Sequence, residues 1–327
     1  MFPRMRHLAL IVAVTFVSQA SADFIEDWDD GAGAARWSAP IVALEDPGIA
    51  FDGNVDYAFD YSTIGAPSAP NSTGGSTLGV ALQTNLTDQC PNDPGCMGSG
   101  EGEGVGIVPL SALADIPAGD FTFTTDLYLY VNGIGGTTEY ATVGVFSQGS
   151  AVPLRFGSDS GDGLAWSVDS DGDSPVDILR FEDPPGSETS LGGYEDIADG
   201  SIPGVPTGMA DPVGPFNQWV ELEISSVSGI ISFLMNGFLL DVFDNTADTF
   251  AGGSLMLGQF DAFDSVNQGG VGASNMAVFD NISLVVGSDQ SVPEPATLAL
   301  LASACVGFVG LRRKTSSRAR EAGSAIE

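Results

Sequence analysis

Two acidic side chains stand at a spacing that could support catalysis. Glu221 and Glu223 occupy alternate positions of a segment in which polar and apolar residues alternate, so both would project from one face of a strand. A pair of carboxyl groups about 5 Å apart can act as nucleophile and acid in a retaining glycoside hydrolase. The next alternate residue is Ser225, so the pattern stops at two acids. The alternative is a pair of glutamates that faces solvent on a binding domain.

A second group of acids has the spacing of metal ligands. Four aspartates stand at positions 1, 3, 5 and 9 of one short segment: Asp169, Asp171, Asp173 and Asp177. Because calcium takes many oxygen ligands from short flexible segments, this run is a candidate calcium site, to which Asp159 and Asp162 could contribute. The pattern departs from a calcium loop of the EF-hand type, since Gly172 falls at position 4 and Arg180 at position 12. A solvated turn between two strands is the alternative.

The composition excludes several other kinds of catalysis. The single histidine is His7 and the single lysine is Lys314, and each lies in an end segment of the chain. Without them, the central part has no Ser-His-Asp triad, no zinc site with histidine ligands and no lysine for a Schiff base. Any intrinsic catalysis must therefore depend on carboxylates, and a protein that is not an enzyme is the favoured interpretation.

The charge of the chain is strongly negative. The formal net charge is −33 for 327 residues. Between residues 23 and 311 only Arg36, Arg155 and Arg180 stand against 41 acidic residues, a net charge of −38. Such a surface repels nucleic acids and anionic lipids and favours divalent cations, although most of these charges are expected to be simply solvated.

The N-terminus has the pattern of a secretory signal peptide over residues 1–22. A basic start is followed by the apolar run Leu8–Val17 and by small residues, so cleavage is expected between Ala22 and Asp23. The oxidising compartment beyond the membrane favours a local disulfide between Cys90 and Cys96, which are separated by a turn-rich spacer.

The C-terminus carries a second apolar segment. After a linker at 288–292, residues 293–314 begin with Pro293-Glu294-Pro295 and continue through an apolar run to a basic end that includes Arg312 and Arg313. Basic residues remain on the cytoplasmic side, so the tail at 315–327 is expected there and a hydrophobic helix would cross the membrane. The segment resembles the PEP-CTERM sorting signal, which implies processing by an exosortase-type enzyme and delivery to the cell envelope, outer surface or extracellular matrix. An ordinary membrane anchor is the alternative.

Residues 23–287 have the pattern of an all-β domain. Segments 55–61 and 121–131 alternate in polarity, and Asn236-Gly237 between two apolar runs predicts a tight hairpin. The opening around Phe24 would supply a first strand that pairs with the last. Residues 219–242, 255–258 and 279–286 resemble concanavalin A-like and laminin-G-like domains, which implies a jelly-roll antiparallel β-sandwich between a signal-peptide helix and a C-terminal hydrophobic helix. Segments 183–216 and 65–71 are rich in Gly and Pro and are predicted to be loops.

The resemblance and the composition together favour one function. The leading hypothesis is an exported, adhesive or glycan-binding sandwich, stabilised by calcium, whose partner is an extracellular polysaccharide. Four aromatic residues are candidates for stacking on sugar rings: Tyr128, Tyr130, Tyr194 and Trp219. Two alternatives remain: a glycoside hydrolase that uses Glu221 and Glu223, and a structural matrix protein without a specific ligand. Three Asn-x-Ser/Thr sequons, at Asn71, Asn85 and Asn281, are expected to be chance occurrences, with glycans attached to exported loops as the alternative.

Overall fold

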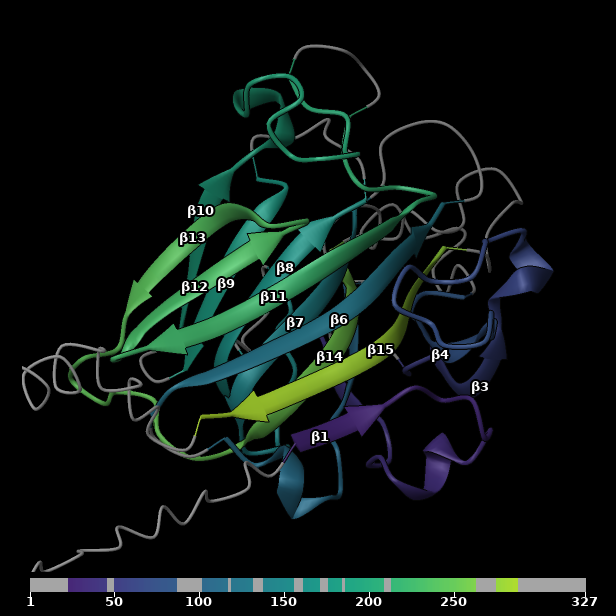
Figure 1. Ribbon diagram of the computed structural model, residues 1–327, viewed down its shortest axis with the longest axis horizontal. Helices are drawn as coiled ribbons and strands as arrows, with labels where there is room; N and C mark the ends of the chain where they lie inside the picture. Colours follow the sequence, from purple (N-terminus) through teal and green to yellow (C-terminus); the bar gives the residue numbers. More distant parts are fainter. Residues whose placement is uncertain are drawn as a thin grey trace, which may run out of the picture. The chain divides into compact units, whose positions relative to one another are not determined.

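The computed structural model shows a sandwich of two antiparallel β-sheets (Figure 1). It describes residues 23–45, 50–86, 102–116, 119–131, 138–155, 161–170, 176–183, 186–208, 213–262 and 275–287. Sheet A has the strand order β13 (Phe238–Asp244), β12 (Ile230–Met235), β11 (Trp219–Val227), β6 (Phe121–Tyr130), β15 (Met276–Val286), β4 (Leu78–Gln83) and β3 (Asn54–Asp60), with β1 (Asp23–Glu26) paired to β15. Sheet B has the order β10 (Ser187–Gly192), β9 (Ile178–Asp183), β8 (Gly163–Asp169), β7 (Glu139–Ser147), β14 (Ser254–Asp261), β5 (Glu103–Ile107) and β2 (Ile41–Leu44). The all-β sandwich expected from the sequence is confirmed.

Strand alternation builds the core between the two sheets. In β6, Phe121, Phe123 and Leu127 are buried and face sheet B, as the period-2 pattern predicts. The indole of Trp166 on β8 stacks on Phe233 of β12, with ring centroids 5.4 Å apart, so the sheets interlock near their β9 and β13 sides. The acidic side chains of β6, β11 and β15, and the tyrosines and tryptophan of β6 and β11, consequently project from the outer face of sheet A.

Tight turns fix the register of the three consecutive strands β11, β12 and β13. Asn236 and Gly237 have φ angles of +48° and +76°, the geometry of a type I′ turn, so the predicted hairpin is confirmed. Ser228 and Gly229 make a second turn with φ angles of +53° and +79°. The first strand pairs with the last, Phe24 opposite Leu284, as the sequence predicts.

The loop predicted over residues 183–216 is only partly a loop. Its first part forms β10, which pairs with β9, and the short 3-10 helix η4 (Tyr194–Asp196) follows. Four apolar side chains of this segment are buried in the core: Tyr194, Ile202, Val205 and Val213. The sequence prediction failed here because these anchors are spaced irregularly among glycines and prolines, which hides them from any test of periodicity.

A covering segment lies on the outer face of each sheet. Residues 61–77, which include the 3-10 helix η2 (Tyr61–Ile64), lie over β4, β6 and β15 of sheet A. Residues 148–155 lie over sheet B, with Val152 and Leu154 packed on Phe260 and its neighbours. Among the described residues, no helix is long and apolar enough to cross a membrane.

Candidate functional site

Three carboxylates form one row across adjacent strands on the outer face of sheet A. Asp126 of β6 lies opposite Glu221 of β11 on one side and opposite Asp280 of β15 on the other. Strand pairing therefore brings together acids that are far apart in sequence. Asp126 and Asp280 are fully buried, whereas Glu221 is half-buried at the open side of the row.

Asp126 holds the covering segment through Asn71 and is also bonded by Asn281 of β15. Its Oδ2 accepts hydrogen bonds from the backbone N–H of Asn71 (3.0 Å) and from Nδ2 of Asn281 (2.9 Å). Its Oδ1 accepts from Nδ2 of Asn71 (2.9 Å), and the same nitrogen donates to Oε2 of Glu221 (3.1 Å). Asn71 therefore bridges the buried and the accessible ends of the row.

Asp280 holds the same segment at a second point. Its Oδ2 accepts from the hydroxyls of Tyr61 and Ser72, each at 3.0 Å, and its Oδ1 accepts from the backbone N–H of Asn281 (2.7 Å). Asn281 has a φ of +51° at a bulge in β15, which turns its side chain toward Asp126. The amide nitrogens of Asn71 and Asn281 thus serve as hydrogen-bond donors inside the fold.

Burial shifts the titration of the row. Loss of water raises the pKa of Asp280 to about 7, against the hydrogen bonds that it accepts, and Asp126 adds to the rise through like-charge repulsion. Burial also raises the pKa of Asp126, and it raises that of Tyr61 to about 12. Every oxygen of both aspartates accepts a hydrogen bond from the protein, so these carboxyls anchor the covering segment and do not reach a substrate.

An aromatic group lies beside the row. Trp219, two residues before Glu221, contacts Tyr61 and Tyr128 edge-on, with ring centroids 5.0 and 5.3 Å apart. Its Nε1 donates to the carbonyl of Pro67 in the covering segment (2.7 Å), which fixes the orientation of the indole. Trp219 and Tyr130 are half-buried and present part of their surface to solvent. Trp219, Tyr130, Glu221, Glu223 and Asn71 are hereafter the Trp219 surface.

Two of the four aromatic candidates do not lie on this surface. Tyr128 is 5% exposed beneath Trp219, and Tyr194 is fully buried in the core, so the prediction that either stacks on a sugar is wrong. Sequence reasoning also missed Asp126, Asp280, Tyr61 and Ser72. The sequence indicated Asn71 and Asn281 only as sequons. The one local indication of the carboxylate row was Asp126, an acidic residue on the outward side of an alternating strand.

The two glutamates of the hydrolase hypothesis share a face of β11 but differ in surroundings. Glu221 belongs to the row, whereas no described residue donates a hydrogen bond to the half-buried carboxylate of Glu223. Residues two apart on a strand lie nearly 7 Å apart. Both side chains are accessible beside Trp219, but nothing described pairs them around a common reacting position.

The aspartates of the calcium hypothesis lie on the other sheet. Asp169 and Asp177 are fully buried at the ends of β8 and β9, where the backbone N–H of Asp169 donates to the carbonyl of Asp177 (2.8 Å). Oδ2 of Asp177 accepts from the backbone N–H of Tyr194 (2.8 Å). Asp159, Asp171 and Asp173 lie outside the described residues. Within the described part of the chain, no group of three acidic, histidine or cysteine ligands is arranged for a metal ion.

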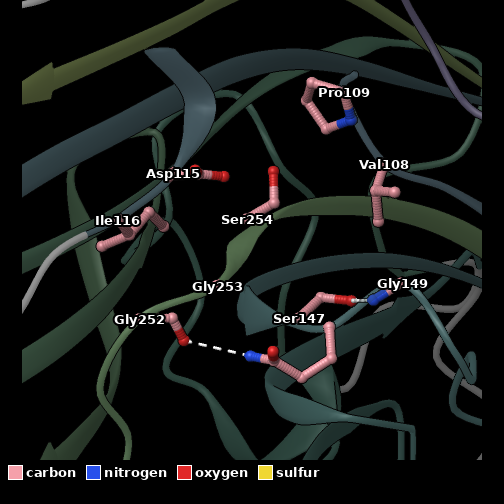
Figure 2. Close-up of a pocket in the computed structure, with 10 residues that line it drawn as sticks. Val108, Pro109, Asp115, Ile116, Ser147, Gly149, Gly252, Gly253 and Ser254 are labelled. Carbon is pink, nitrogen blue, oxygen red and sulfur yellow. Dashed lines mark hydrogen bonds between the residues drawn. The ribbon is translucent and has the colours of Figure 1, made fainter. Parts of the chain in front are cut away.

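A cleft of about 600 Å³ opens where β7 ends and β14 begins (Figure 2). Glycines 149, 252 and 253 form much of its wall, and Asp115 is its one charged lining side chain. Two of the lining polar side chains are already engaged: Gln148 donates to the carbonyl of Gly252 (3.2 Å), and Oγ of Ser147 accepts from the N–H of Gly149 (3.1 Å). The cleft therefore offers a ligand fewer directed contacts than the Trp219 surface.

Other predicted sites lie outside the described residues. These are the cleavage point after Ala22, the disulfide between Cys90 and Cys96, and the terminal segment with Pro293, Glu294, Pro295, Arg312 and Arg313. Asp23 is described only as the first residue of β1. Their structure is not described, so these predictions rest on the sequence, apart from the family match of the terminal segment.

Three solved structures show a distant likeness to this chain. A protein from Bacillus subtilis with a galectin-like fold is 10% identical, with 83% of this chain and 98% of that chain covered, at a TM-score of 0.41. The exoplasmic domain of VIP36, bound to Ca²⁺ and Man3GlcNAc, is 13% identical over 75% and 86%, at 0.35. The carbohydrate-binding module CBM66 from Bacillus subtilis is 14% identical over 56% and 81%, at 0.32. Likeness at this level does not identify a ligand.

The terminal segment gives the specific match. No curated protein matches the chain in sequence. Residues 291–314 match the family model described as the PEP-CTERM protein-sorting motif, which confirms the sequence-based assignment of this segment. The chain therefore carries a PEP-CTERM sorting motif at its C-terminus, and that motif marks it as a protein exported to the cell envelope or surface.

Proposed function

We propose that this exported sandwich binds glycans through the Trp219 surface and is not an enzyme. The observation that carries the proposal is a half-exposed indole, held in place by Pro67, beside the carboxylates of Glu221 and Glu223 and the amide of Asn71. Sugar recognition needs a flat apolar surface for the ring face and polar groups at its edge for the hydroxyls. The Trp219 surface supplies both.

Preorganisation supports binding at this place. The buried bonds of Asp126 and Asp280 hold Asn71 and Ser72 in position, so a ligand would not have to order the covering segment when it binds. A rigid surface binds more tightly than a flexible one because less conformational entropy is lost.

The Trp219 surface also lies far from the C-terminal end of β15. Val278, which lies beside Tyr128, is eight residues from Val286, about 27 Å along the strand.

The hydrolase alternative has less support. The carboxylates that burial perturbs most strongly in this row, Asp280 and Asp126, are covered and fully hydrogen-bonded. The accessible pair, Glu221 and Glu223, projects from one strand side by side, whereas the two carboxyls of a glycosidase flank the bond that breaks. A surface that holds sugar without cleaving it fits these positions better.

A glycan array followed by calorimetry would test the proposal. We expect Trp219→Ala to weaken binding at least tenfold, about 1.4 kcal/mol, while Trp219→Phe retains part of the affinity. Leu239→Ala is the matched control because Leu239 is 50% exposed on the edge strand of the same sheet. Melting curves of each variant would separate lost binding from lost folding. An unmodified protein that binds nothing on the array would remove the proposal.

We further propose that an exosortase-type enzyme processes the chain and that the mature protein spans residues 23–287 and part of the linker 288–292. The match of the sorting motif over residues 291–314 supports this. Mass spectrometry of the envelope fraction would then find an N-terminus at Asp23 and no peptide that contains Arg312 or Arg313. Recovery of the intact terminal peptide from surface material would instead favour a permanent membrane anchor.

A further inference from the structure

We infer that the glycan recognised at the Trp219 surface carries free amino groups, as a polymer of deacetylated hexosamine does. The inference rests on the proposed function and names the chemical class of its ligand. Its basis is the placement of every positive charge in the exported domain, together with the two carboxylates beside Trp219.

Each arginine of the exported domain is already engaged in an ion pair. Arg36 bonds Glu26 (2.6 Å) and Asp30 (2.8 Å) near β1, where Trp37 also contacts Glu26. The hydrogen bond from Arg36 lowers the pKa of Asp30 to about 2. These contacts hold Arg36 at the N-terminal edge of the fold, away from β11.

The other two arginines are on the side of sheet B. Arg180 bonds Asp241 (2.8 Å) and Glu182 (2.9 Å) and thereby links β9 to β13 across the sandwich. Arg155 lies 3.6 Å from Glu188 and donates to the hydroxyl of Tyr140 (2.9 Å). Because residues 23–311 contain no other lysine, arginine or histidine, no further cation is available to the Trp219 surface.

This arrangement selects against acidic glycans. Uronate, sulfate and phosphate groups are recognised through charge-assisted bonds from arginine or lysine, and the domain has none to offer at this surface. The net charge of −38 over residues 23–311 would also repel an anionic polymer before contact. Both effects would weaken the binding of an acidic polysaccharide.

The same arrangement favours an ammonium group. Glu221 has one oxygen on Asn71, and Glu223 has no hydrogen-bond donor among the described residues, so both retain capacity to accept. Bonds from an ammonium to a carboxylate are about twice as strong as neutral hydrogen bonds. Both glutamates project from the face of β11 that also carries Trp219, so a sugar ring on the indole brings its substituents near them.

Chitosan oligosaccharides would test the inference on the exported protein purified in detergent. Fully deacetylated and fully N-acetylated oligomers of equal length would be titrated by calorimetry at slightly acidic pH, where the amines are charged. We expect the deacetylated oligomer to bind at least tenfold more tightly, and the difference to shrink as salt is added because the attraction is screened. An oligogalacturonate of matched length is the acidic comparison and should not bind.

A matched pair of charge variants isolates the contact from the overall field. Glu223→Gln should reduce the difference in affinity between the two oligomers. Asp56→Asn removes the same charge at an exposed site on β3, which β6, β15 and β4 separate from β11, and should leave that difference unchanged. Equal affinities, or tighter binding of the oligogalacturonate, would overturn the inference and leave glycan binding intact. Binding of no oligosaccharide of any class would count against the proposed function itself.

Discussion

The two outer faces of the sandwich are both covered, but the carboxylates that hold the two covering segments differ in burial. On sheet A, residues 61–77 are held by hydrogen bonds to two buried carboxylates, Asp126 and Asp280. On sheet B, residues 148–155 are held by apolar packing, in which Val152 lies over strands that carry glycine at the contact, and by the half-buried Asp162, which accepts hydrogen bonds from the backbone N–H groups of Ser150 and Ala151. A Cβ on Gly106 would lie 3.0 Å from a methyl of Val152, so the segment can approach this closely only because the strand has no side chain at that position.

The difference shows which face is suited to a ligand. The covering of sheet B buries its aromatic residues completely: Phe260 stacks on Tyr140 at 4.7 Å and meets Phe181 edge-on at 5.9 Å. The covering of sheet A stops at Trp219 and leaves its indole and the neighbouring glutamates accessible. The outer face of sheet B is closed over its aromatic residues, whereas the outer face of sheet A keeps polar and aromatic groups accessible above its buried carboxylates.

The largest effect is expected on the closed face. Phe260→Ala should lower the free energy of unfolding by about 3–5 kcal/mol, because it opens a cavity under Val152 and removes both ring contacts. Urea denaturation would measure the loss. Phe260→Leu keeps most of the volume and should cost clearly less. Equal stability of the alanine variant and the unmodified protein would show that the covering segment, and not the ring, closes this face.

How much of this could be read from the sequence depends on the range of the interactions. Alternation revealed β6 and β11, and Asn236-Gly237 revealed a hairpin, because both signals are local. The segment 183–216 gave no such signal, although Tyr194 and Ile202 anchor it in the core. A buried side chain in an irregular segment is recognised only when its tertiary contacts are known.

The carboxylate row could not be found in this way. The sequence indicated Glu221 through its spacing to Glu223. In the structure, Glu221 lies opposite Asp126 of the neighbouring strand β6 and accepts a hydrogen bond from Asn71 of a distant loop. The row depends on strand order in sheet A, in which β6 lies between β11 and β15. A single sequence does not specify that order, so residues 95 and more positions apart gave no hint of their contact.

The outer face of sheet A should respond to pH through Asp280. Asp280 has an ordinary pKa of 3.8 and a folded-state pKa of about 7, so between these values the folded state binds more protons than the unfolded state. Stability from this group is therefore greatest below pH 4 and falls as pH rises to 7, by at most about 1.4 kcal/mol for each pH unit. Asp280→Asn removes the titration and should gain stability relative to the unmodified protein across this range.

Chemical denaturation at a series of pH values would show this difference. The variant and the unmodified protein should diverge steadily from pH 4 to pH 7, since the hydroxyls of Tyr61 and Ser72 can reorient toward an amide. Glu103 is a second group whose pKa burial raises to about 7, and it remains in both proteins, so its contribution cancels. Parallel curves would mean that Asp280 remains ionised when buried.

The smallest effect is expected for calcium binding on the side of sheet B. Asp169 and Asp177 are fully buried on that side, and with Asp171 and Asp173 they form the predicted calcium site. Calcium at a hundredfold excess over its dissociation constant should add about 2.7 kcal/mol to the stability of protein first treated with chelator. The double variant Asp171→Asn, Asp173→Asn should lose this gain, whereas Asp199→Asn should keep it. A melting temperature that calcium leaves unchanged would remove the metal from this site.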